Sequence, residues 1–197
     1  MATLQKLRRR IGTRLSPPLV AALVRSPVSP NMLTVAGVAI TFAAAWLASS
    51  GTFFAAGIVL FVAALCDLAD GALARATDRL TSFGAVLDSA GDRISEALLL
   101  GGLSIWFVKT GNMSGALVSY VALVSSFLVS YLRARGESLG IECTVGLCTR
   151  PERAIVLTLG LLTGLVFVAV SIVAFFASMT VVERLVCLRR KGKEMGI

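Results

Sequence analysis

Four aspartates lie close together in the middle of the chain, within residues 66–95, CDLADGALARATDRLTSFGAVLDSAGDRIS. Each stands at the edge of an apolar run, where a carboxylate is costly unless a cation or another partner compensates its charge. Asp67 and Asp70 are three residues apart, and Asp88 and Asp92 are four apart. Each pair therefore falls on one face of a helix if the flanking apolar runs are helical. The spacing predicts two carboxylate pairs that could share a cation.

The ligand types and the small residues between them indicate what this cation would do. Carboxylate oxygens favour Mg²⁺ or Mn²⁺ over zinc, and the chain has no histidine. Gly71, Ala74 and Gly84 have almost no side chain, so a bulky ligand could approach the backbone beside the aspartates. The pattern predicts a site for a metal-bound phosphate compound. A structural ion-pair cluster or a polar pore lining is the alternative that these residues leave open.

The same residues carry a resemblance to a known family. The pattern D-x-x-D-G-x-x-A-R, eight further residues and then G-x-x-x-D-x-x-x-D resembles the signature of the CDP-alcohol phosphotransferase family at every defined position. It is formed by Asp67, Asp70, Gly71, Ala74, Arg75, Gly84, Asp88 and Asp92. The resemblance implies a membrane enzyme that transfers a substituted phosphate from a CDP-linked lipid to an alcohol and releases CMP.

The family's site residues can be carried over to matching positions. The resemblance implies that Asp67, Asp70 and Asp88 are the principal metal ligands. Asp92 matches the family's general base for the acceptor hydroxyl, and it could also be a metal ligand. The implied nucleotide-binding residues are Asp67, Asp70, Gly71, Ala74, Arg75, Gly84, Asn31 and Thr34. Asn31 and Thr34 match a Pro-Asn-x-x-Thr segment of the family, although Asn31 could instead be a helix cap.

Basic residues farther along the chain favour a phosphorylated acceptor. The segments SYLRAR (130–135) and RPER (150–153) resemble the phosphatidylinositol-phosphate synthase branch of the family. In that branch, basic residues matching Arg133, Arg153 and Arg184 hold the acceptor phosphate. The resemblance therefore implies inositol phosphate as acceptor, with glycerol 3-phosphate as the enzymatic alternative, and a homodimer. Topological charge near anionic lipid headgroups is the other explanation for these arginines.

The composition is typical of an integral membrane protein. Hydrophobic residues make up 56% of the 197-residue chain and charged residues only 15%, which is outside the usual range of soluble domains. The net charge of +8 does not indicate nucleic-acid binding, because the chain has no room for an exposed basic domain. A transporter or membrane scaffold would explain the apolar runs but not the aspartate motif.

The apolar runs predict an all-α integral membrane protein with six transmembrane helices, preceded by an N-terminal interfacial amphipathic helix. The predicted domains are an amphipathic juxtamembrane segment, a catalytic domain and a basic cytoplasmic tail, at residues 1–31, 32–188 and 189–197. Four spans are expected at about 32–49, 53–75, 84–108 and 114–132, followed by two short spans within 154–182 that turn near Thr163 and Gly164.

Charge supports the pair of short spans. With two spans there, eighteen of the nineteen basic residues fall on one side of the membrane and only Lys109 lies outside. A single span would translocate the basic C-terminus, against the positive-inside rule. We therefore expect a multi-pass cell-membrane protein with both termini and the active site on the cytoplasmic side.

Two further predictions concern the four cysteines and Glu96. The four cysteines, Cys66, Cys143, Cys148 and Cys187, are expected to be free thiols, because the loop that holds the middle two should face a reducing compartment. Glu96 lies one helical turn after Asp92. It could orient Asp92 or a neighbouring group, or it could be a packed or paired acid.

Overall fold

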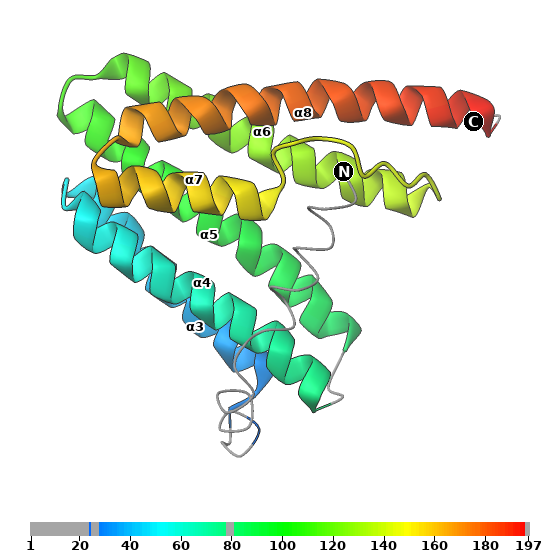
Figure 1. Cartoon of the computed structure of the whole chain (residues 1–197), viewed down its shortest axis with the longest axis horizontal. Helices are drawn as coiled ribbons and strands as arrows, with labels where there is room; N and C mark the ends of the chain where they lie inside the picture. The colour runs from blue at the N-terminus through cyan, green and yellow to red at the C-terminus, as the bar shows by residue number, and fades with distance from the viewer. Residues whose placement is uncertain (1–23, 25–27, 78–80, 196–197) are drawn as a thin grey trace. The chain divides into compact units, whose positions relative to one another are not determined.

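The computed structural model describes residues 24, 28–77 and 81–195. These residues form six α-helices and no strand, which confirms the all-α prediction (Figure 1). The predicted amphipathic helix lies almost entirely outside the described residues. The helices are α3 Pro30–Ser49, α4 Phe53–Ala76, α5 Ser82–Lys109, α6 Met113–Ser138, α7 Arg150–Thr163 and α8 Val166–Glu194.

The last apolar region forms two helices rather than one, as the charge distribution predicts. Gly164 ends α7 with a left-handed backbone conformation (φ 74°), which glycine adopts at little steric cost. Its amide donates to the Leu161 carbonyl, and α8 begins two residues later at Val166. The predicted turn near Thr163 and Gly164 is therefore confirmed.

Among the described residues, four helices are long and apolar enough to cross a membrane, namely α3, α4, α6 and α8. The chain is thus a multi-pass membrane protein. The 14 residues of α7 reach only about 21 Å at 1.5 Å per residue, which is shorter than the hydrocarbon layer. The 29 residues of α8 are longer than the hydrocarbon layer is thick. This helix ends at Glu194 and therefore includes most of the predicted basic tail.

The chain forms two compact units. One comprises Met1–Ala43 and Val59–Ser95, and the other comprises Ala44–Ile58 and Glu96–Ile197. The first unit contains the aspartate motif, and the second contains the predicted acceptor arginines. In the first unit, small residues let the helices approach closely. A Cβ atom added to Gly91 would lie 3.2 Å from Thr34 Cγ2, and one on Gly37 would lie 3.7 Å from Cys66 Cβ.

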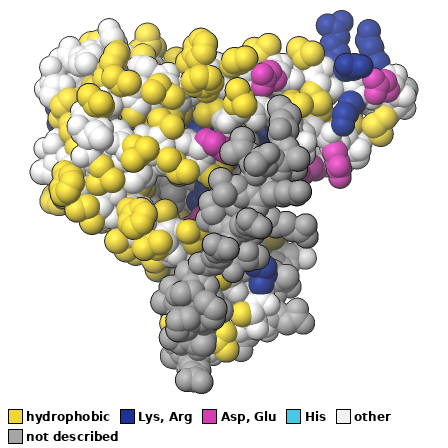
Figure 2. Space-filling model, viewed as in Figure 1, with side chains coloured by type: hydrophobic (Ala, Val, Ile, Leu, Met, Phe, Trp, Pro, Cys, Tyr) yellow, Lys and Arg dark blue, Asp and Glu magenta, His cyan; other side chains and the backbone are white. Residues whose placement is uncertain are grey.

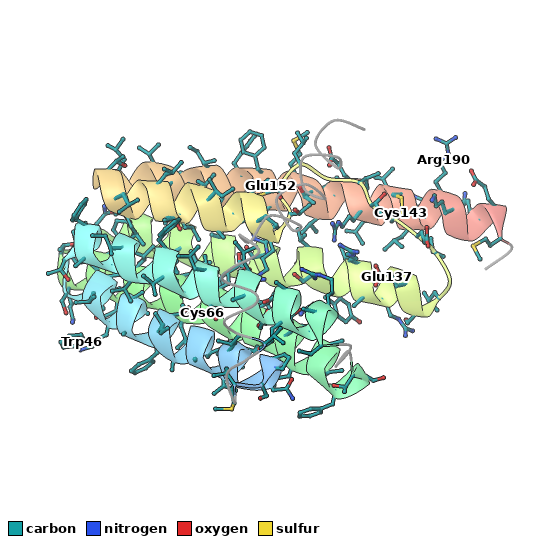
Figure 3. The ribbon with its side chains drawn as sticks, turned by 60° about the horizontal axis from the view of Figure 1, so that its bottom comes forward. Trp46, Cys66, Glu137, Cys143, Glu152 and Arg190 are labelled. Atoms are coloured by element: carbon teal, nitrogen blue, oxygen red, sulfur yellow. A yellow bond between two sulfur atoms is a disulfide. The ribbon has the colours of Figure 1, made fainter. Side chains whose placement is uncertain are left out.

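In the second unit, α8 packs along both α6 and α7 (Figures 1 and 3). A Cβ on Gly160 of α7 would lie 2.2 Å from Ala169 Cβ of α8, so glycine is required for this approach. Ser125 of α6 and Ser178 of α8 share a hydrogen bond of 2.8 Å. Many outward side chains are hydrophobic, and Lys and Arg gather at the C-terminal end of α8 (Figure 2).

The prediction of four free thiols is wrong for two of them. Cys143, in the loop between α6 and α7, forms a disulfide with Cys187 of α8 (Figure 3). Cys66 and Cys148 are free. The two bonded cysteines are 44 residues apart in sequence, and they meet because α8 runs back beside α6 and its following loop. Lys191 of α8 also donates to the Glu142 carbonyl of this loop.

Candidate active site

Three of the four motif aspartates converge in the first unit. Asp67 and Asp70 come from the C-terminal half of α4, and Asp88 comes from the N-terminal part of α5. One carboxylate oxygen of each lies within 4.8 Å of the others. Asp70 is only 5% exposed, and buried carboxylates repel one another unless a cation or proton intervenes. Three converging hard oxygen ligands fit a divalent cation of the Mg²⁺ or Mn²⁺ class.

Asp92 lies one helical turn after Asp88 on α5 and is partly buried. It is not a member of the group of three. The structure therefore separates the four motif aspartates into a triad and a fourth carboxylate on the same helix as one of its members.

Helix α3 contributes a second contact to the triad. The Thr34 hydroxyl donates to Asp70 Oδ2 at 2.6 Å, and Thr34 is 8% exposed. A short bond to a charged oxygen holds a carboxylate more firmly than a bond between neutral groups does. Thr34 was predicted near the nucleotide, and the structure places it beside an aspartate of the triad.

Asn31 lies on the first turn of α3, which begins at Pro30. The residue that caps this helix is Ser29, whose hydroxyl accepts from the Met32 amide at 3.3 Å. The cap alternative for Asn31 is therefore wrong, because Pro30 occupies the first helical position and moves the cap one residue earlier. Asn31 instead lies next to the small residue at the start of α5, since its Oδ1 would be 3.3 Å from a Cβ on Gly84.

The other predicted nucleotide-binding residues line the end of α4. Arg75 is exposed, and its Nη1 would lie 3.3 Å from a Cβ added to Gly71. The guanidinium therefore folds back over the glycine one turn earlier. Ala74 is partly buried. A cationic side chain thus lies on the small-residue surface that the sequence predicts for a phosphate ligand.

The predicted acceptor arginines lie in the second unit, where Arg153 is almost completely buried. Its side chain is 1% exposed and forms a bidentate ion pair with Glu96, with Nη2 to Oε2 at 2.8 Å and Nε to Oε1 as the second bond. Nη1 donates to the Cys148 carbonyl at 3.0 Å. The sequence left the role of Glu96 open, and the structure identifies it as a paired acid.

Arg184 and Arg133 occupy different environments. Arg184 is 3% exposed, and it donates from Nε to the Val145 carbonyl at 3.1 Å and from Nη1 to the Val129 carbonyl. Arg133 is half exposed and pairs with Glu137 at 2.8 Å on the same helix. Two of the three arginines are thus buried, and the third is held at the surface of α6.

The loop residue Cys148 borders the buried ion pair. Burial raises the pKa of its thiol to about 11, and Glu152 and Glu96 act in the same direction while Arg153 opposes them. The thiol is therefore protonated at neutral pH, and a protonated thiol is a poor nucleophile and metal ligand. This cysteine supplies its carbonyl to the site and not its sulfur.

Comparison with known proteins gives the same family as the motif. Residues 27–187 match the CDP-alcohol phosphatidyltransferase family. The chain is 36% identical to a phosphatidylinositol phosphate synthase of Streptomyces avermitilis over 208 aligned residues, covering 98% of this chain and 85% of that protein. It is also 36% identical to an archaetidylinositol phosphate synthase of Pyrococcus horikoshii, covering 86% of this chain and 87% of that protein.

Solved structures are similar as well. The fold matches Mycobacterium tuberculosis phosphatidylinositol phosphate synthase with CDP-DAG bound, with a TM-score of 0.81, 30% identity and coverage of 89% of this chain and 94% of that one. A structure of the same mycobacterial enzyme in complex with manganese and citrate matches with a TM-score of 0.80 and 31% identity, covering 87% of each chain. With the family match over most of its length and relatives of this identity, the chain belongs to the CDP-alcohol phosphatidyltransferase family.

Proposed function

We propose that this protein transfers a phosphatidyl-type group from a CDP-linked lipid to inositol phosphate and releases CMP. The observation that carries the proposal is the convergence of Asp67, Asp70 and Asp88 within 4.8 Å at the motif of the family. The names of the relatives support the acceptor, because they include phosphatidylinositol phosphate and archaetidylinositol phosphate synthases. The CDP-DAG bound to the mycobacterial enzyme supports the donor.

The donor is held at the aspartate motif. The triad binds Mg²⁺ or Mn²⁺, which when bound neutralises the donor pyrophosphate and makes CMP a better leaving group. Arg75 supplies a cation for a phosphate oxygen. The nucleotide contacts the small residues Gly71, Ala74 and Gly84, together with Asn31 and Thr34 of α3.

The acceptor phosphate is held by Arg133, Arg153 and Arg184. Guanidinium groups bind phosphate through paired N–H donors. Arg184 carries a buried positive charge whose hydrogen-bond partners among the described residues are the carbonyl oxygens of Val145 and Val129. A buried cation hydrogen-bonded to neutral groups favours an anionic ligand.

Asp92 acts as the general base. It accepts the proton of the acceptor hydroxyl, whose oxygen then bonds to the phosphorus that carries the lipid, while the bond from that phosphorus to CMP breaks. Asp92 is partly buried and lies outside the triad, which supports a role separate from that of the three principal ligands. A role as an additional metal ligand is compatible with the same position.

The active site lies at the cytoplasmic edge of the membrane. The protein has six transmembrane helices within residues 32–188, and both of its termini lie in the cytoplasm. It assembles as a homodimer. The basic residues of α8, among them Arg190 and Lys191, face anionic lipid headgroups. The positive-inside distribution of the sequence supports this orientation.

The function is tested by CMP release from CDP-diacylglycerol in detergent micelles. Inositol phosphate, glycerol 3-phosphate, free inositol and serine are compared as acceptors, with Mg²⁺, with Mn²⁺ and with a chelator. We expect metal-dependent CMP release that is fastest with inositol phosphate. Preference for glycerol 3-phosphate or an unphosphorylated acceptor would contradict the assignment of inositol phosphate as acceptor. Absence of CMP release with every acceptor would contradict the transferase activity.

Asp92→Asn tests the base in the same assay. We expect the loss of transfer with retained binding of CDP-diacylglycerol, because the amide keeps the size of the side chain but cannot accept the proton. Asp88→Asn serves as the contrasting variant, since loss of a triad ligand should weaken donor binding too. Full activity of the Asp92 variant would disprove its role as base.

A further inference from the structure

We propose that Glu96 is the positioning residue for Arg153, and that it fixes this guanidinium in the orientation that the acceptor phosphate needs. The inference rests on the proposed function, because it assigns Arg153 to the acceptor. Glu96 lies outside the aspartate motif, and the function described so far gives it no role.

The geometry allows Arg153 little freedom. Glu96 accepts from Nε and from Nη2 in a side-on bidentate arrangement, and the Cys148 carbonyl accepts from Nη1. Bonds on both edges of the planar group fix its rotation as well as its position. The guanidinium has further N–H groups on Nη1 and Nη2, and these are not bonded within the described part of the chain, so they are the donors left for a ligand.

The ion pair of Arg153 and Glu96 is much more deeply buried than the Arg190–Glu194 ion pair of the same chain. The side chains of Arg153 and Glu96 are 1% and 10% exposed, whereas those of Arg190 and Glu194 are 83% and 63% exposed. Burial of a charged pair costs desolvation free energy that the attraction often fails to recover. Stability alone is therefore a poor explanation for Glu96.

Glu96 also neutralises the charge of Arg153 among neighbouring arginines. Arg184 is repelled electrostatically by both Arg133 and Arg153, and Glu137 attracts it. Arg133 has its own partner in Glu137. Glu96 neutralises Arg153 and lets it stay near Arg184, while the buried charge of Arg184 remains to attract an anion. Loss of Glu96 would let the Arg153 side chain turn away from its cationic neighbour.

The kinetic consequence is specific to the acceptor. A positioned anchor sets the affinity for the phosphate that it holds, while the donor is bound by other residues. We expect Glu96→Gln, which keeps one acceptor oxygen but removes the charge, to raise the KM for inositol phosphate about tenfold and to change the KM for CDP-diacylglycerol by less than about twofold. Glu96→Asp keeps the charge on a shorter side chain and should raise the acceptor KM about threefold.

A double-mutant comparison separates positioning from general support of the fold. In the Arg153→Ala background, Glu96→Gln should produce no further rise in the acceptor KM, because the residue through which it acts is gone. Glu194→Gln removes an exposed ion pair and serves as the matched control, with no change expected in either KM. Thermal unfolding of each full-length variant in detergent is measured in parallel.

The outcomes distinguish this inference from the function on which it rests. If Arg153→Ala raises the acceptor KM but Glu96→Gln does not, or if Glu96→Gln acts equally strongly with and without Arg153, the positioning role is overturned and the function stands. If Arg153→Ala leaves the acceptor KM unchanged, the acceptor site itself is wrong. If Glu96→Gln does not fold, an unchanged acceptor KM in folded Glu96→Asp overturns the positioning role.

Discussion

Asp70 is a buried carboxylate that lies close to two other carboxylates. It is nine-tenths buried, and its carboxylate shares a small space with those of Asp67 and Asp88. Two unit charges separated by 4.8 Å repel by about 3 kcal/mol at an effective dielectric constant of about 20. The hydroxyl of Thr34 offsets part of this cost for Asp70, and a bound divalent cation would offset more of it. The residues that surround a metal ligand therefore contribute to metal affinity.

Thr34→Val tests this contribution at the residue scale. Valine has nearly the volume of threonine but no hydroxyl, so Asp70 would lose the donor at 2.6 Å. We expect the Mn²⁺ concentration for half-maximal CMP release to rise about tenfold, as for other residues that orient metal ligands. Thr34→Ser keeps the hydroxyl and should restore most of the affinity.

The matched control for this variant is Thr41→Val on the same helix. Thr41 is also buried, but its hydroxyl donates to the Gly37 carbonyl of its own helix. Its replacement should leave the Mn²⁺ requirement unchanged. Equal effects of the two valine variants would show that Thr34 supports packing rather than the metal site.

At the scale of elements, the loop between α6 and α7 contacts both buried arginines, Arg153 and Arg184. Its carbonyls at Val145 and Cys148 accept from Arg184 and Arg153. The loop is attached to α8 by the Cys143–Cys187 disulfide. Since Arg184 also belongs to α8, the disulfide and the Arg184 hydrogen bond attach the loop to the same helix, whereas the Arg153 hydrogen bond attaches it to α7. Loop geometry and arginine orientation are therefore coupled.

Removal of the disulfide tests the strength of this attachment. The bond closes a segment with a sequence separation of 44, and disulfides of this span contribute about 2–4 kcal/mol to the free energy of unfolding. We expect the double variant Cys143→Ser with Cys187→Ser to unfold at a lower temperature than the oxidised protein in detergent. Cys66→Ser leaves the bond intact and should melt like the unchanged protein.

The oxidised protein can also be checked directly by its thiols. Denatured without reductant, it should expose only the thiols of Cys66 and Cys148 to a thiol reagent. Labelling of all four cysteines before reduction would contradict the bond.

At the scale of the whole molecule, the distribution of basic residues favours one orientation in the membrane. The proposed topology has six crossings, although α7 has only 14 residues. A helix of this length crosses if its ends reach the interface or if the bilayer thins locally. The basic end of α8 (Figure 2) then lies in the cytoplasm, as the positive-inside rule requires.

A reporter fused after Ile197 tests the orientation. We expect it to be active in the cytoplasm and inactive outside, whereas a reporter inserted between Thr110 and Gly111 should give the opposite result. A C-terminal reporter found outside would exclude the proposed topology. The proposed topology places the Cys143–Cys187 bond on the cytoplasmic side, where disulfides are uncommon, so a C-terminal reporter also identifies the compartment of this bond.

The sequence by itself determined the features that depend on local spacing. The helical period places Asp67 and Asp70 on one face, and apolar runs locate the helices, so the family motif, the approximate positions of the helices and the turn at Gly164 could be predicted. The ends of α6 at Ser138 and of α8 at Glu194 lie beyond the predicted spans. The tertiary structure decided which distant residues meet. Thr34 bonds to Asp70, Glu96 pairs with Arg153, and Cys143 bonds to Cys187. The sequence could not predict these partners, because contacts across tens of residues depend on how whole helices and loops pack and not on any local period.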